Sequence, residues 1–134
     1  MNTAQKGAVA EIKVAADLTA KGFRVFVALG TSGDYDLVID RDGGLERIQV
    51  KYSMPTATSV IARCRTHSNT SKQQTHRAYT PDCFEWLAVY NPREDEIYYL
   101  PSSMMTKETI YLHLKKEPPK HFPNVNLTQN FKSI

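Results

Sequence analysis

Residues 34–51 read DYDLVID, RDGG and LERIQVK, and this stretch decides the fold that the sequence predicts. Residues 35–40 and 45–52 are rich in Val, Ile, Leu and Tyr, and apolar and polar side chains roughly alternate along them. Such alternation is typical of a β-strand with one buried face. Residues 41–44 (RDGG) carry the Asp-Gly signal of a tight turn. The stretch therefore predicts a β-hairpin.

The register of this hairpin decides which polar residues meet. If Asp40 pairs with Leu45, Asp36 lies opposite Gln49. Opposed residues share one face of the sheet, with Cβ atoms about 5 Å apart, and Lys51 shares that face because it follows Gln49 by two residues. The other face is apolar and carries Leu37, Ile39, Ile48 and Val50. We expect the apolar face to pack on a core, and a slip of one residue would break the polar grouping.

A carboxylate, an amide oxygen and an ammonium on one face suit a divalent cation beside a phosphate. Hard cations prefer oxygen ligands, which Asp36, Gln49 and the backbone carbonyl of Val50 can offer. Lys51 could hold a phosphate, orient or deprotonate water, or stabilise developing charge. The ordinary alternatives are a strand-end aspartate bonded to its loop, sheet-surface polarity and an exposed lysine. Taken together at one register, the residues favour metal-dependent nuclease chemistry.

Residues 3–21 predict an amphipathic helix, with Thr3 as its N-cap and Gly22 as the glycine that ends it. Glu11 is the one charge within the helix's apolar face. A carboxylate is costly to bury unless it is paired or bound to a cation. A helix packed on the hairpin could aim Glu11 at Asp36. The alternative is a glutamate at a helix crossing with its tip in water.

The rest of the chain predicts further strands and a closing helix. Strands are expected at 23–29, 59–65, 84–91 and 97–100, an exposed polar loop at 66–80, a turn at 92–95, a helix at 103–114 and an extended tail from Lys115. This order predicts an α/β (α+β) fold, with a mixed central sheet flanked by helices. We expect one domain over 1–134, with its core at about 3–101 and the C-terminal helix and tail at about 102–134.

Composition limits the class of protein. The 134 residues are 41% hydrophobic and 23% charged, with a net charge of +3; this mildly basic balance permits nucleic-acid binding. No apolar run approaches the roughly 20 residues of a membrane span, and the first residues lack a signal-peptide core. Two cysteines make no disulfide framework. We therefore expect a cytoplasmic protein without a membrane partner. No glycine-rich motif predicts a nucleotide cofactor.

Basic residues after the hairpin are candidates for DNA contacts. Arg63 and Arg65 share one face of their predicted strand, which suits phosphates or guanine edges; Lys72 and Arg77 lie in the polar segment that follows. The alternative is a solvated basic surface. Four residues form the pattern C-x2-H-x8-H-x6-C: Cys64, His67, His76 and Cys83. Zinc sites usually have tighter paired spacing, so core cysteines and loop histidines are favoured.

The site residues resemble the PD-(D/E)XK nuclease superfamily: Glu11 on an N-terminal helix, Asp36 opening a strand, and Gln49-Val50-Lys51 on the next strand. The helix pattern is also similar to that of archaeal Holliday-junction resolvases, which carry an acidic residue where Gln49 stands. The Gln-x-Lys variant and the closing strand 97–101 more closely resemble the cyanobacterial group I intron-encoded homing endonuclease branch. Tyr35 replaces the proline of the name-giving motif.

The resemblance implies Mg²⁺-dependent hydrolysis of phosphodiester bonds in double-stranded DNA, with Mn²⁺ as a possible substitute. It implies Asp36 as the central metal ligand, with Glu11 and Gln49 completing the metal shell or orienting water. A small domain covers little DNA, so a specific site predicts a homodimer or homotetramer. Two alternatives stay open: a Holliday-junction resolvase, and a non-catalytic DNA-binding domain on the same fold, for which Gln49 is the argument.

Overall fold

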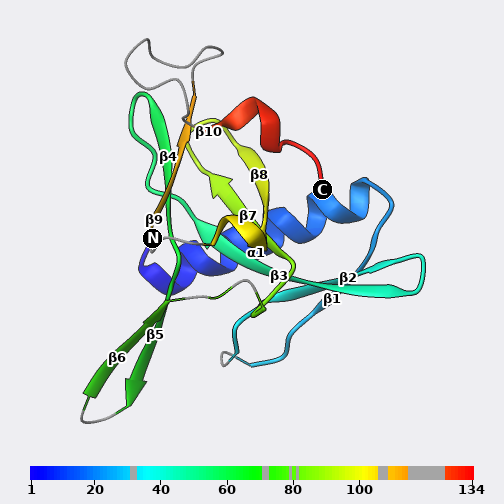
Figure 1. Ribbon diagram of the computed structural model, residues 1–134, viewed down its shortest axis with the longest axis horizontal. Helices are drawn as coiled ribbons and strands as arrows, with labels where there is room; N and C mark the ends of the chain where they lie inside the picture. Colours follow the sequence, from blue (N-terminus) through cyan, green and yellow to red (C-terminus); the bar gives the residue numbers. More distant parts are fainter. Residues whose placement is uncertain (31–32, 71–72, 79, 81, 106–108, 115–125) are drawn as a thin grey trace.

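A five-stranded mixed sheet forms the centre of the protein (Figure 1). The computed structural model describes residues 1–30, 33–70, 73–78, 80, 82–105, 109–114 and 126–134. In sheet order the strands are β1 (Arg24–Val27), β2 (Leu37–Arg41), β3 (Gly44–Tyr52), β7 (Trp86–Asn91) and β8 (Glu96–Pro101). Within this sheet, β3 and β7 run parallel, and the other neighbouring strands are antiparallel. The predicted α+β class with a mixed sheet is confirmed.

The two faces of the sheet are covered differently. Helix α1 (Thr3–Ala20) crosses one face (Figure 1). Packed against the other face, at its β7–β8 end, is a three-stranded sheet of β10 (Asn126–Leu127), β9 (Thr109–His113) and β4 (Ser59–Arg63). A hairpin of β5 (Arg65–Thr70) and β6 (Gln73–Ala78) extends away from both sheets. Among the described residues, no helix is long and apolar enough to cross a membrane.

Neighbouring residues cap both ends of α1. The cap at its start is Asn2, not the predicted Thr3: Asn2 Oδ1 accepts from Gln5 N, and Gln5 Oε1 accepts from Asn2 N, each at 2.9 Å. This capping box satisfies two orphan N–H groups. Gly22 ends the helix as predicted, with φ +92°. Its N–H and that of Phe23 close a Schellman motif onto Thr19 and Leu18.

One stripe of α1 holds it to the sheet. Ala10, Val14 and Leu18 are spaced by four residues and are fully buried. They pack in one core cluster with the apolar face of the hairpin, which includes Leu37, Ile39, Ile48 and Val50. Burying each of the larger side chains contributes roughly 1.5–3 kcal/mol. This packing sets the neighbouring Glu11 at the edge of the same interface.

The hairpin has the predicted register. Asp40 pairs with Leu45 and Leu37 with Ile48. Asp42 and Gly43 have φ values of +52° and +88°, as a two-residue type I′ turn requires. Asp40 Oδ1 accepts from Gly43 N at 2.7 Å, so Asp40 serves the turn. The sequence therefore contained enough local information to fix which residues of β2 and β3 are opposed.

The second half of the chain departs from the prediction. The helix expected at 103–114 is wrong: a short 3₁₀ turn, η1 (Ser102–Met104), precedes strand β9, in which Ile110 and Leu112 are buried and Tyr111 is exposed. The polar loop expected at 66–80 is largely the β5–β6 hairpin. The predicted extended tail lies outside the described residues at 115–125 and then forms β10 and a 3₁₀ turn, η2 (Thr128–Phe131).

Candidate active site

Asp36 is held by backbone contacts on both sides, immediately before β2. Its N–H donates to the carbonyl of Ile48 at 2.9 Å, and its own carbonyl accepts from the N–H of Ala28 at 3.1 Å. These bonds continue the sheet past the end of the strand. They fix the Asp36 side chain on the face that the hairpin register predicted.

The carboxylate of Asp36 is bound to β3. Oδ2 accepts from the N–H of Val50 at 2.8 Å and from Nε2 of Gln49 at 2.7 Å. Burial raises the pKa of Asp36, while the Val50 N–H and the nearby Lys51 act in the opposite direction. A cation placed beside this buried carboxylate would replace the solvation that burial removes.

Gln49 has an oxygen without a partner. Its side chain is buried, with 5% of its surface exposed. Nε2 donates to Asp36 and to the carbonyl of Val50, at 3.1 Å for the latter, while Oε1 has no hydrogen-bond partner among the described residues. A half-turn of the amide exchanges its two terminal atoms. Three oxygens, from Asp36, Gln49 and Val50, would then converge, which is a donor set that suits a hard cation.

Lys51 follows on the same strand and is partly buried. Burial lowers the pKa of Lys51, and the charge of Asp36 raises it in part. A partly buried ammonium close to a carboxylate is suited to bind an incoming phosphate. Burial also raises the pKa of the neighbouring Cys64 to about 11, because the buried surroundings disfavour the charged thiolate.

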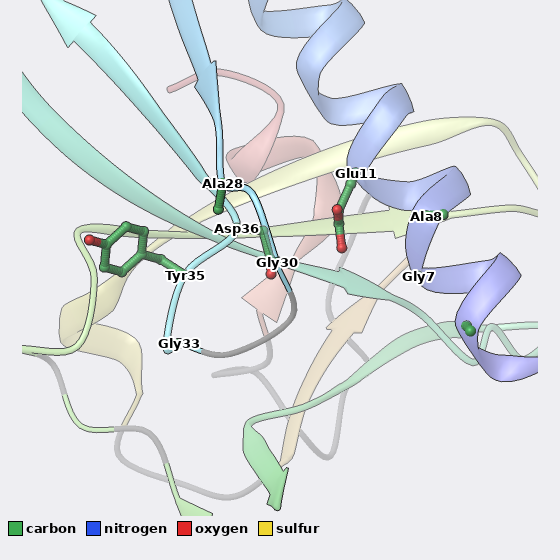
Figure 2. Close-up of a pocket in the computed structure, with 9 residues that line it drawn as sticks. Gly7, Ala8, Glu11, Ala28, Gly30, Gly33, Tyr35 and Asp36 are labelled. Carbon is green, nitrogen blue, oxygen red and sulfur yellow. The ribbon is translucent and has the colours of Figure 1, made fainter.

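Glu11 reaches the site from α1. Figure 2 shows its side chain projecting from the helix into the cleft that Asp36 also lines. Partial burial raises the pKa of Glu11, and the charge of Asp36 adds to the effect. A carboxylate whose proton affinity is raised by a second carboxylate is a common arrangement at cation sites. The structure thus brings together Glu11, Asp36, Gln49 and Lys51, all from the predicted set.

The cleft around these residues has two lobes that share Gly7, Glu11 and Asp36. The first, here the cationic lobe, has a volume of about 490 Å³ and is also lined by Lys6, Gln49, Val50, Lys51, Tyr52 and Arg63. The second, here the small-residue lobe, has a volume of about 370 Å³ (Figure 2) and is also lined by Ala4, Ala8, Ala28, Gly30, Gly33 and Tyr35. Three cationic side chains in the first lobe favour an anionic ligand there.

The predicted DNA contacts are only partly placed. Arg63 ends β4 and lines the cationic lobe with its exposed side chain. Lys72, and the side chains of Arg65 and Arg77, lie outside the described residues. The sequence reasoning gave no site role to Lys6 or Gly7. Gly7 precedes Glu11 by four residues, and that spacing was the available signal, because residues three and four apart share a helix face. Lys6 is five residues from Glu11 and had no such signal.

The oxygen donors fit a hard divalent cation better than zinc. Within the described ranges, no group of three or more His, Cys, Asp or Glu residues could hold a metal. A metal site would therefore rest on Asp36 and Glu11 together with two neutral oxygens, from Gln49 and Val50. Mg²⁺ needs only one or two protein carboxylates because it keeps several waters and takes phosphate oxygens. The zinc alternative requires His67 and His76, whose side chains lie outside the described residues.

Comparison with known proteins agrees with this geometry. A solved structure described as the bacterial homing endonuclease I-Ssp6803I is similar, with a TM-score of 0.77, 20% sequence identity, and coverage of 98% of this chain and 89% of that one. Among curated proteins, none matches this chain. The family model for PD-(D/E)XK endonucleases matches residues 1–134. The chain therefore belongs to the PD-(D/E)XK endonuclease family.

Proposed function

We propose that this protein is a Mg²⁺-dependent, site-specific endonuclease that hydrolyses phosphodiester bonds in double-stranded DNA. The observation that carries the proposal is the buried side chain of Gln49, which bonds Asp36 through Nε2, lines the cationic lobe with Asp36 and Lys51, and has no partner for Oε1 among the described residues. A polar atom left unsatisfied in this way is costly and is matched by a water, an ion or another ligand in most proteins.

Each group in the cleft has a task in this proposal. Asp36, Glu11, Gln49 Oε1 and the carbonyl of Val50 would hold the metal. When bound, Mg²⁺ polarises the phosphate and favours ionisation of water. Lys51 binds the scissile phosphate and stabilises the charge that develops on it. Glu11, with its raised pKa, orients the attacking water from the helix side.

The homing type of endonuclease is the form that we favour. Its support is the Gln-x-Lys arrangement on β3 and the structural likeness to a homing endonuclease. A chain of 134 residues covers few base pairs. Recognition of a long site therefore needs a symmetric homodimer or homotetramer. Light scattering of the protein with and without DNA tests this part, and a monomer on its target would contradict it.

The central experiment compares two variants of the same strand segment. Wild type, Asp36→Asn and Asp40→Asn are incubated with Mg²⁺ or Mn²⁺ and with two substrates: a randomised linear duplex pool and a four-way junction. Asn keeps a hydrogen-bond acceptor at both positions, and each variant loses one carboxylate charge. Only Asp36→Asn loses that charge inside the cleft. We expect cleavage by wild type and Asp40→Asn only. Continued cutting by Asp36→Asn would refute the site.

The same experiment separates the other functions. Cutting of the four-way junction alone would identify a junction resolvase. Binding of DNA without cutting, together with calorimetry that detects no Mg²⁺, Mn²⁺ or Ca²⁺ binding, would identify a non-catalytic DNA-binding domain.

A further inference from the structure

Gly7 is a glycine that the protein's own packing does not require. It lies inside α1, where glycine is less favourable than alanine because it gives the unfolded chain more freedom. A Cβ built at this position would meet nothing within 4 Å. Its backbone is helical, so no left-handed conformation demands glycine either. The reason for glycine here must be sought outside the free protein.

The position of Gly7 supplies that reason. It lines both lobes of the cleft, one helical turn before Glu11. Ala4 and Ala8 are also small and line the same lobe, so the side chains of α1 that face this lobe are short. Small residues alone do not make a site. The adjoining cationic lobe, however, is also lined by the buried side chain of Gln49, whose Oε1 has no hydrogen-bond partner among the described residues, and this independently indicates a ligand.

The charges around Gly7 indicate what kind of ligand comes close. Lys6 precedes it, lines the cationic lobe, and has Nζ 5.8 Å from the centroid of the Tyr52 ring. This cation–π contact holds the ammonium over the cleft while leaving its hydrogen-bond donors available to an anion. Arg63 lines the same lobe from β4. An extended anion that runs over a small-residue helix surface and between these cations matches a sugar–phosphate backbone.

We propose that Gly7 is the point of closest approach between α1 and the DNA backbone, and that Lys6 pairs with the phosphate next to the scissile one. The inference rests on the proposed function for the identity of the ligand. Without a side chain at residue 7, the sugar can lie against the helix and bring the scissile phosphate within reach of the Asp36 carboxylate. Any side chain at this position would hold the backbone away from the metal-binding oxygens.

The test exploits opposite effects on stability and binding. Gly7→Ala should raise the melting temperature by about 3 °C, since alanine favours the helix. It should also weaken binding of a fluorescent 30-base-pair duplex at least about tenfold, measured by anisotropy with Ca²⁺. Gly7→Leu should weaken it further. Ala16→Gly is the matched control, because Ala16 is exposed on α1 and lines neither lobe: it should lower the melting temperature and leave binding unchanged.

The outcomes separate the inference from the proposed function. If Gly7→Ala is more stable and binds the duplex as tightly as wild type, the inference is overturned. It is also overturned if Lys6→Gln leaves the slope of log affinity against log salt unchanged, since loss of one phosphate contact should reduce the slope by about one. A wild type that binds the duplex but never cuts it with Mg²⁺ refutes the nuclease, and the Gly7 variants then still decide the inference by binding alone.

Discussion

The side-chain amide of Gln49 donates a 2.7 Å hydrogen bond to Oδ2 of Asp36, joining the residue that precedes β2 to the middle of β3. A carboxylate at position 49 would repel the carboxylate of Asp36. Here the amide donates to Asp36, and its own oxygen has no partner among the described residues. The neutral residue therefore stabilises the buried carboxylate while keeping an oxygen for a cation.

Replacing Gln49 with glutamate should exchange stability for metal affinity. Gln49→Glu adds a buried negative charge beside Asp36 and Glu11, so we expect the metal-free protein to melt several degrees lower. Calorimetry should show about tenfold tighter Ca²⁺ binding, because ligand charge tunes affinity. Gln49→Met is the control of similar size: it should lose metal affinity without the penalty of a new charge. Equal Ca²⁺ affinity in wild type and Gln49→Met would exclude Gln49 as a ligand.

Removing the charge of Glu11 should stabilise the metal-free protein. The pKa of Glu11 is raised by burial and by Asp36, so ionised Glu11 is less favourable in the folded protein than in the unfolded chain. Glu11→Gln relieves this cost, and we expect a higher melting temperature together with Ca²⁺ affinity reduced at least about tenfold. Glu94→Gln, in the exposed turn after β7, should change neither property. A lower melting temperature for Glu11→Gln would show that Glu11 is structural.

Local signals carried most of what the sequence could predict. The Asp42–Gly43 turn fixed the hairpin register, and that register alone places Asp36 beside Gln49. The cap signals marked both ends of α1 to within one residue. The meeting of Glu11 with Asp36 is tertiary, and only the unusual charge on an apolar face pointed to it.

The failures have physical reasons too. Ser102 and Ser103 are possible N-caps and favoured a helix at 103–114, although the burial of residues 109–113 alternates as in a strand. Pairing with β4 overrides the weak helical preference of this short segment. The β5–β6 hairpin has almost no apolar residues, so hydrophobic periodicity could not reveal it. No role for Gly7 could be predicted, because the open space beside its Cα is visible only in the structure.

The hairpin turn should be sensitive to one glycine and tolerant of its neighbour. Gly43 has φ +88°, which an L side chain rarely adopts, whereas Gly44 does not have a positive φ. Gly43→Ala should destabilise the protein by about 1 kcal/mol, because the type I′ geometry strains the new side chain. Gly44→Ala places its Cβ 3.4 Å from the carbonyl oxygen of Arg41, an ordinary contact, and should cost less. Urea denaturation of both variants measures the difference; equal costs would contradict the turn assignment.

The ion pair between Arg47 and Glu85 should make stability depend on acidic pH. Glu85 accepts from Nη2 of Arg47 at 2.8 Å and from Nε, and these donors lower the pKa of Glu85. The unfolded chain therefore binds the proton more readily than the folded one. The contribution is complete above the ordinary glutamate pKa and is lost as the pH falls through the lowered folded value.

This sign predicts how Glu85→Gln compares with wild type. The two side chains are 36% and 39% exposed, so solvent screens the pair, and we expect the variant to be less stable by only about 0.5–1 kcal/mol at pH 7. The difference should shrink below about pH 4.5 and approach zero once Glu85 is protonated in the folded protein. Urea denaturation of both proteins at pH 7, 5 and 3 measures it. A difference that stays constant across this range would show that the Arg47 contacts stabilise the fold without the charge of Glu85.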